Sequence, residues 1–283
     1  MKILVTGCKG QLGRELHDVL EERQPGITTY IDIDELDLTD RTAVEAYLRA
    51  GEFSHVVNCA AYTAVDRAEE ENLLCAAVNT DAVTNLARVA DELGFKVLHI
   101  STDYVFDGHN YRPYTESDKV NPLSQYGTSK RKGETALLGL APDSVIIRTG
   151  WLYSPHGKNF VKTILRLSAE QPSIRVVCDQ VGTPTYARDL AEAVATVLFA
   201  PQWVPGIFNF SNEGVASWYD FAVAIQRYRG ITGCPVHPCL TVDYPTPAKR
   251  PTYAVLDKSR FKVTYGVEIP HWEEALARCL ARL

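Results

Sequence analysis

The sequence predicts an α/β protein: a doubly wound parallel sheet with a smaller, mostly C-terminal substrate-binding lobe. Three observations support this fold class. Short apolar strand patterns alternate with helix patterns of 10–20 residues through residues 1–150, an order typical of parallel sheets. A glycine-rich turn separates the first strand from the first helix. After Trp151, short strands and prolines replace the regular alternation.

The elements follow from the hydrophobic pattern along the chain. Apolar, β-branched runs predict buried strands over residues 2–6, 27–33, 56–61, 97–102 and 144–149. Helical spacing predicts a helix after Gly10 and further helices over residues 41–50, 73–93, 126–138, 159–169, 187–199, 217–229 and 271–283. We expect a dinucleotide-binding domain over residues 1–150, to which about 175–200 return. Residues 151–283 then form mainly the substrate lobe.

The turn after the first strand carries Gly7, Gly10 and Gly13. In a strand–turn–helix, such glycines permit the turn, the approach of a diphosphate and close packing of the helix on the strand. The diphosphate meets the positive end of the helix dipole and its free N–H groups. The spacing differs from G-x-G-x-x-G. A glycine turn without a ligand is the alternative, which its position directly after a first strand disfavours.

The second strand ends at an acidic group that bears on cofactor choice. Asp32 can bond the adenosine ribose hydroxyls, which favours NAD over NADP. Lys9 and Arg14 lie near the loop in sequence and can receive a 2′-phosphate, so NADH and NADPH both stay open. Asp37 can reach the adenine amino group. Thr39 or Asp40 can cap the following helix.

A tyrosine and a lysine stand four residues apart on one predicted helix. Tyr126 and Lys130 face the same way, and an ammonium near a phenol lowers the phenol pKa from about 10. Tyr126 is then suited to act as a general acid. Thr102, at a strand end, can orient the same substrate oxygen. Lys130 can also bond the nicotinamide ribose, so with the glycine turn the pair predicts hydride chemistry at a carbonyl or alcohol.

Two further side chains are candidates for substrate contact. Trp151 can pack on a sugar ring, or it is a core tryptophan. Arg250 stands in a proline-rich loop, where a planar guanidinium suits a nucleotide diphosphate. A solvated surface arginine is the alternative for this residue.

Composition narrows the class of protein. The 283 residues carry a net charge of −6, so we expect no nucleic-acid partner. No run is apolar enough to span a membrane, and the N-terminus is a strand rather than a signal peptide. Seven scattered cysteines predict free thiols in a reducing compartment, hence a cytoplasmic protein. Cys234 and Cys239 flank a histidine but lack further ligands, so we predict no metal there.

Six segments resemble the dTDP-4-dehydrorhamnose reductase family, within the extended short-chain dehydrogenases/reductases with their Rossmann-type sheet. They are TGCKGQLG (6–13), NCAAYTAVDRAE (58–69), STDYVFDG (101–108), PLSQYGTSK (122–130), RTGWLY (148–153) and DQVGTPT (179–185). The resemblance implies reduction of the C4 keto group of a dTDP-6-deoxy-hexulose by NADH or NADPH. A dTDP-sugar is then the small-molecule partner, and a homodimer is one implied assembly.

The resemblance also implies roles for individual residues. Thr102, Tyr126 and Lys130 would be catalytic, and Thr102, Asp103 and Trp151 would contact the sugar nucleotide, to which the chemistry of the residues adds Arg250. The cofactor would lie on Gly10, Gln11, Leu12, Asp37, Leu38, Ala61, Tyr62 and Thr63. The sequence pattern itself adds Gly7, Gly13, Asp32, Ala60, Tyr126 and Lys130 to this cofactor set. Some family members dimerise around a metal held by glutamates. Glu15 can be such a ligand, but the other ligands do not align, so no metal is predicted.

Alternative functions remain open at this level. A 4-epimerase or a dehydratase of the same superfamily would share the fold, although Asp103-Tyr104 stands where a dehydratase usually has Asp-Glu. A non-catalytic regulatory subunit, similar to the β subunit of methionine adenosyltransferase, would bind the cofactor and dock on a partner enzyme. The intact Thr102, Tyr126 and Lys130 disfavour that function.

Overall fold

The computed structural model describes all residues 1–283 and is organised around a parallel sheet of six strands. The strand order is β10-β5-β4-β3-β1-β2, and every pairing is parallel. The strands are β1 (Ile3–Thr6), β2 (Thr28–Ile31), β3 (His55–Asn58), β4 (Lys96–Thr102), β5 (Val145–Thr149) and β10 (Gly206–Asn209). The carboxyl ends of the strands therefore meet at one edge, where ligands bind in doubly wound sheets.

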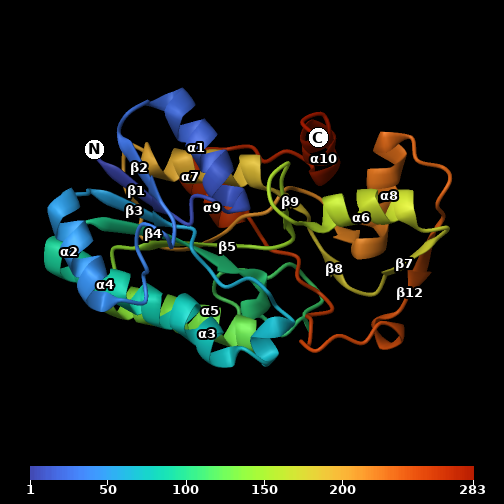
Figure 1. Cartoon of the computed structure of the whole chain (residues 1–283), viewed down its shortest axis with the longest axis horizontal. Coiled ribbons are helices and arrows are strands. Elements are labelled where there is room, and N and C mark those ends of the chain that lie inside the picture. Colours follow the sequence, from blue (N-terminus) through green and yellow to red (C-terminus); the bar gives the residue numbers. More distant parts are fainter.

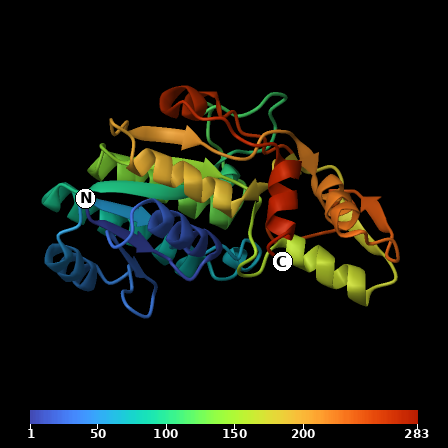
Figure 2. The same cartoon turned by 90° about the horizontal axis from the view of Figure 1, so that it is seen from above.

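Helices cover both faces of this sheet (Figures 1 and 2). One layer contains α1 (Gln11–Arg23), α7 (Ala187–Leu198) and α9 (Ser259–Tyr265), and the other α2 (Arg41–Gly51), α4 (Ala82–Leu93) and α5 (Gln125–Leu140). Successive strand residues point to opposite faces. Accordingly, Ile3 and Val5 pack in the core beneath α1 and α7, whereas Leu4 packs in the core beneath α2 and α4.

A lobe built mainly from the C-terminal half lies at one end of the sheet, on the right in Figure 1. Its helices are α6 (Phe160–Glu170), α8 (Trp218–Arg229) and α10 (Trp272–Leu280). Its short strands pair as β6 (Leu152–Tyr153) with β9 (Thr185–Tyr186), β7 (Ile174–Val177) with β12 (Val236–Cys239), and β8 (Val181–Gly182) with β11 (Ala216–Ser217). These elements surround a separate core that includes Phe221 and Trp272.

Only the second half of the segment expected to return, about residues 175–200, packs on the sheet domain. The strand β7 stays in the lobe because it pairs with β12. The helix α7 packs on α1 as expected, and β10, which was not predicted, extends the sheet beside β5. The helix α9, which also packs against this core through Phe261, was not predicted because it spans only seven residues.

The helix predicted over residues 73–93 is present, but its hydrogen-bond pattern is not α-helical throughout. A π-helical turn (Ala77–Asp81) lies between α3 (Asn72–Ala76) and α4. The turn presents Asn79, fully buried, to the loop after β3, where its amide binds both the N–H and the carbonyl of Tyr62 at 2.9 and 3.0 Å. Such bulges often mark functional regions. None of the helices has the length and apolar character needed to cross a bilayer.

Candidate active site

The glycine turn joins β1 to α1 with two glycines that the fold itself requires. Gly7 has a φ of 67°, and a Cβ there would lie 2.7 Å from the Ala60 nitrogen. A Cβ on Gly13 would lie 2.3 Å from the Gly7 oxygen. Gly10 differs, because its φ is −72° and a Cβ would meet only the Gly7 oxygen, at 3.2 Å. Space at Gly10 is therefore available to a ligand.

The start of α1 fits a diphosphate. Gly10 is its N-cap, and no side chain caps the free N–H groups of the first turn. The Leu12 side chain packs in the core, so only its backbone can face a ligand. The Gln11 side chain turns toward the lobe and accepts a hydrogen bond from Asn159 at 2.9 Å. Gln11 and Leu12 can therefore contact a cofactor only through their main chain.

The acidic residues after β2 already have partners on the chain. The Asp32 carboxylate accepts from the Lys9 backbone N–H at 2.9 Å and so holds the glycine turn in place. The Lys9 ammonium pairs with Asp34. Asp37 accepts from the Thr39 N–H and hydroxyl at 2.9 and 2.8 Å, beside the buried Leu38. Asp40 caps α2 by accepting from the Ala43 N–H.

The segment Ala60–Thr63 follows β3 along the same edge of the sheet. Its backbone is fixed at both ends: the Ala60 N–H donates to Asn58, and Tyr62 is held by Asn79. The Tyr62 hydroxyl donates to Glu71 at 2.6 Å. The four residues are half-buried or exposed, so they border the region between the glycine turn and α5.

The helix α5 brings Tyr126 close to the end of β4. It begins after Ser124, whose hydroxyl accepts from the Gly127 N–H at 3.1 Å. A Cβ on Gly127 would lie 2.3 Å from the backbone carbonyl oxygen of Tyr104. The helix α5 therefore packs tightly on the turn that follows Thr102. The rings of Tyr126 and Tyr104 meet edge to face at 5.5 Å. The structure therefore brings Tyr126 to Thr102, whose hydroxyl interacts with the phenol.

Lys130 lies behind this group, directed into the sheet. Its Nζ donates to the Ile100 carbonyl at 2.6 Å and lies 3.2 Å from His99 Nε2. The side chain is buried, and burial lowers the pKa of Lys130 to about 8.

The pKa of Tyr126 differs from the expectation. Burial raises it, and the interaction with the Thr102 hydroxyl opposes that effect only in part. The Lys130 Nζ is directed to the Ile100 carbonyl of β4. In this state the phenol holds its proton.

Asp103 is a second perturbed acid at the site. Its carboxyl is buried against Gly150 and accepts from the Thr102 hydroxyl at 3.0 Å. Burial raises the pKa of Asp103 to about 7, and hydrogen bonds lower it only in part. The group next to Thr102 therefore changes charge close to neutral pH.

Trp151 and Arg250 stand where the sheet domain meets the lobe. Trp151 has a φ of 51° and stacks on Trp218, with ring centroids 3.5 Å apart and planes 8° apart. It is half-buried, so it is not a closed core residue. Arg250 binds the Asp66 carboxylate at 2.6 Å and the Tyr104 hydroxyl at 3.0 Å.

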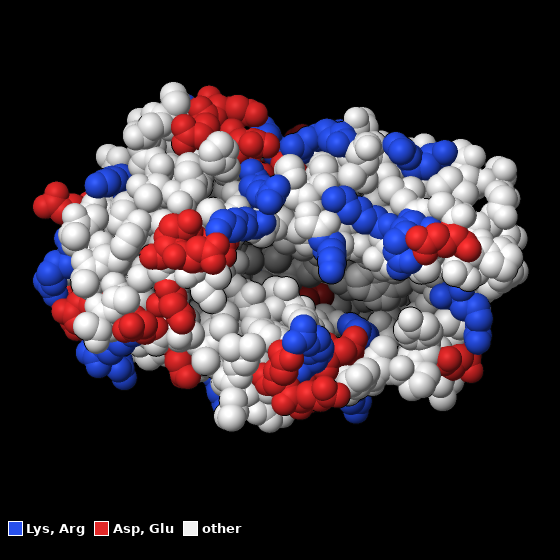
Figure 3. All heavy atoms as spheres, in the orientation of Figure 1, with Lys and Arg blue, Asp and Glu red and all other residues white.

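A cavity of about 380 Å³ opens beside these residues in the lobe. Its lining includes Phe160, Arg175, Gln180, Trp218, Tyr244 and Arg250. Figure 3 shows this face of the molecule hollowed between the sheet domain and the lobe, with basic side chains along the upper rim. Aromatic faces next to arginines suit a base and a diphosphate.

Several residues of the site were not predicted. Asn58 and His99 interrupt buried apolar strands, and a polar residue in such a strand was the available signal. Asp66, Tyr104 and Trp218 carry no local signal, because their partners are distant in the sequence.

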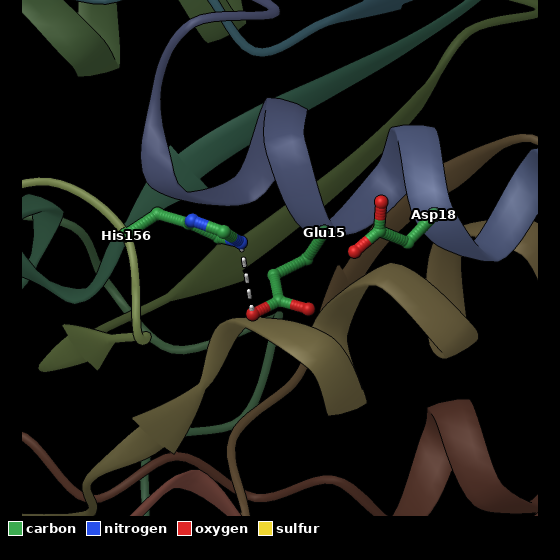
Figure 4. Close-up of side chains that lie close together, drawn as sticks. All are labelled: Glu15, Asp18 and His156. Atoms are coloured by element: carbon green, nitrogen blue, oxygen red, sulfur yellow. Dashed lines mark ion pairs between the residues drawn. The ribbon is translucent and has the colours of Figure 1, made fainter. Parts of the chain in front are cut away.

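The chain has one group of three potential metal ligands, outside this site. Atoms of Glu15, Asp18 and His156 lie within 4.8 Å of one another (Figure 4). Glu15 is fully buried, and both its oxygens accept from Arg282, at 3.0 and 2.7 Å. That guanidinium already compensates the Glu15 charge.

The sheet, the glycine turn at its first strand and the Tyr126–Lys130 pair at its carboxyl edge define a nicotinamide-dependent oxidoreductase of the extended short-chain dehydrogenase/reductase type. Comparison with known proteins identifies the family within this class. A sequence model of the RmlD substrate binding domain family matches residues 1–283, and the chain belongs to that family.

Its relatives share the whole architecture. The chain is 39% identical to the dTDP-4-dehydrorhamnose reductase of Aggregatibacter actinomycetemcomitans, over 97% of each chain. A crystal structure of a dTDP-4-dehydrorhamnose reductase from Clostridium acetobutylicum superimposes with a TM-score of 0.95 at 43% identity, over 99% of each chain. The crystal structure of the Bacillus anthracis dTDP-4-dehydrorhamnose reductase in complex with NADP superimposes with a TM-score of 0.95 at 34% identity, over 100% of each chain.

Proposed function

We propose that this protein uses NADPH or NADH to reduce the C4 keto group of dTDP-4-dehydro-6-deoxy-L-mannose (dTDP-4-dehydrorhamnose), forming dTDP-L-rhamnose. One observation carries the proposal: the Tyr126 phenol interacts with the Thr102 hydroxyl at the carboxyl edge of the sheet, on the helix that also carries Lys130, and the glycine turn at the same edge has free space at Gly10. The full-length similarity to dTDP-4-dehydrorhamnose reductases supports the choice of substrate.

The residues present fit a nicotinamide dinucleotide. The uncapped start of α1 would hold the diphosphate, and the segment Ala60–Thr63 would border the cofactor. When bound, the reduced nicotinamide supplies the hydride for the keto carbon. Lys9 and Asp32, which bear on the choice between NADPH and NADH, contact each other through the Lys9 N–H and the Asp32 carboxylate.

The proton for the keto oxygen comes from Tyr126. Burial raises the pKa of its phenol, so the group is protonated at neutral pH, which is the form that a reductase needs. Thr102 lies within reach of the phenol and orients the same oxygen by a hydrogen bond. On the sugar nucleotide side, Asp103 and Trp151 border the reacting ring, and Arg250 binds the diphosphate. Seven free cysteines support a cytoplasmic site for the reaction.

Turnover with the sugar nucleotide tests this function. The purified protein is mixed with NADPH or NADH, and the 4-keto sugar nucleotide is generated in the same vessel. We expect a loss of reduced-nicotinamide absorbance that requires the sugar nucleotide, with dTDP-L-rhamnose as product. A 4-epimerase would give a new sugar without net loss of reduced cofactor. Cofactor binding without any turnover would instead favour a regulatory subunit.

A further inference from the structure

A chain of buried polar side chains crosses the sheet behind the active site. Thr6 on β1, Asn58 on β3, His99 on β4 and Lys130 on α5 are each at most 2% exposed. The Thr6 hydroxyl donates to Asn58 Oδ1 at 2.7 Å, Asn58 Nδ2 lies 3.1 Å from His99 Nδ1, and His99 Nε2 lies 3.2 Å from Lys130 Nζ. Each contact is within hydrogen-bonding distance, so the protonation of one group constrains the next.

The donor and acceptor roles in this series of hydrogen bonds are fixed at Asn58. The Ala60 backbone N–H, which can only donate, lies 3.2 Å from Asn58 Oδ1. The Thr6 hydroxyl meets the same oxygen. This places the NH₂ of the Asn58 amide toward β4, where it donates to His99 Nδ1.

His99 is therefore a neutral imidazole with its proton on Nε2. A neutral ring has one donor and one acceptor nitrogen, and Asn58 occupies the acceptor. The ring is fully buried, and burial lowers the pKa of His99 well below its usual range, which disfavours the doubly protonated form. The Nε2–H is thus directed at Lys130 Nζ.

An ammonium at Lys130 would oppose this donor. An ammonium carries three donors and no acceptor, so two donors would face each other at 3.2 Å. A neutral amine accepts from His99 Nε2–H and still donates to the Ile100 carbonyl at 2.6 Å.

Other titratable groups facing Lys130 come from the helix and from neighbouring segments. They are Cys59, Cys75 and Glu134. Of these three, only Glu134 is ionised at neutral pH, and its charge favours the ammonium. Its two oxygens are already bound by the Arg148 guanidinium at 2.8 and 2.7 Å, which compensates most of that charge.

We propose that His99 is a positioning residue: oriented by Asn58 and the Ala60 N–H, its Nε2–H favours the neutral amine over the ammonium at Lys130 in the cofactor-free protein. The significance for catalysis rests on the proposed function, in which Lys130 lies on the same helix as the proton donor Tyr126. Lys130 then loses its charge at a lower pH than exposed lysines do. His99 acts through Lys130 and does not itself touch substrate.

The charge of Lys130 can be measured without substrate or cofactor. The cofactor-free protein is prepared with ¹³C/¹⁵N-labelled lysine, and the Cε shift of Lys130 is followed by NMR from neutral to alkaline pH. The Lys130→Met variant assigns the signal. We expect a midpoint near 8, well below that of exposed lysines at about 10.4. A midpoint shared with the exposed lysines would overturn the proposal.

Two variants test whether His99 and Asn58 are the cause. Asn58→Asp makes His99 Nδ1 a donor to the new carboxylate, so Nε2 becomes an acceptor for an ammonium. His99→Gln introduces no charge, and its amide can turn its oxygen toward Lys130. In both we expect the Lys130 midpoint to rise by about one unit or more, the equivalent of one hydrogen bond.

Thr80→Val is the matched control. It removes the bond from the Thr80 hydroxyl to the Ser129 carbonyl of the same helix, at 2.9 Å, without touching Lys130 Nζ. The midpoint of the Lys130 titration should stay at its wild-type value in this variant.

An unmoved Lys130 midpoint in both Asn58→Asp and His99→Gln would contradict the proposal. Should Asn58→Asp not fold, His99→Gln alone decides. Because no turnover is involved, this result is independent of whether the proposed reaction is correct.

Discussion

Arg250 of the C-terminal lobe and Asp66 of the loop after β3 form an ion pair, with Nη2 2.6 Å from Oδ2. They are 184 residues apart in sequence, and the pair joins the lobe to the sheet domain beside the cavity. The second arm of the guanidinium, Nη1, donates to the Tyr104 hydroxyl. Arg250 is thereby held in place before any ligand arrives.

We expect Arg250→Lys to raise KM for the sugar nucleotide about tenfold or more, since a lysine cannot replace a planar, two-armed donor on a diphosphate. The value of kcat should change much less. Steady-state kinetics check this, with Asp66→Asn as the matched variant that breaks the ion pair but keeps the guanidinium. Equal KM values in Arg250→Lys and the wild type would remove Arg250 from the substrate site.

Tyr126→Phe should lower kcat by about 10²- to 10⁴-fold, because it deletes the proton donor. Cofactor affinity, measured by nicotinamide fluorescence, should persist. Tyr228→Phe is the control, because this exposed ring of α8 lies outside the site and loses only its hydroxyl. A Tyr126→Phe protein with near wild-type turnover would show that another group delivers the proton.

Gly10→Ala and Gly13→Ala should fail in different ways. A Cβ at Gly13 would be 2.3 Å from the Gly7 oxygen, so we expect a lower melting temperature as well as lost cofactor binding. A Cβ at Gly10 meets its nearest atom at 3.2 Å. That variant should melt near the wild-type temperature yet bind NADPH at least about tenfold more weakly, because the methyl occupies the ligand's space. Thermal melts and cofactor titrations separate the two; full affinity in Gly10→Ala would argue against a diphosphate there.

Asp103 should make the protein less stable as pH rises. Burial raises the pKa of this carboxyl to about 7, above its ordinary value of about 4. Its contribution is therefore fully favourable below about pH 4 and is lost as pH increases toward and through 7. Asp103→Asn keeps an oxygen for the Thr102 hydroxyl but cannot ionise.

We expect the melting temperature of Asp103→Asn, relative to wild type, to increase by several degrees between pH 5 and 8, as about 2–3 kcal/mol of ionisation cost is removed. Scanning fluorimetry across that range measures it. A difference between the two proteins that stays constant with pH would show that Asp103 does not titrate in this window.

Much of the sheet could be predicted because apolar runs such as Val56–Val57 and Val97–Leu98 must be buried on both faces. The start of α5 and the proximity of Thr102 to Tyr126 also follow from local pattern. The break at Asn79 and the place of β10 could not be predicted, since both depend on contacts with distant segments. The direction of Lys130 depends likewise on His99 and the Ile100 carbonyl, which helical spacing alone does not reveal.

The destination of the hydride tests the central claim most directly. The protein is supplied with NADPH carrying deuterium at the transferable position of the nicotinamide, together with the 4-keto sugar nucleotide, and the product is examined by NMR and mass spectrometry. We predict dTDP-L-rhamnose with one deuterium, bound to C4. Oxidation of the cofactor without deuterium at C4, or binding of both ligands with no product, would contradict the account.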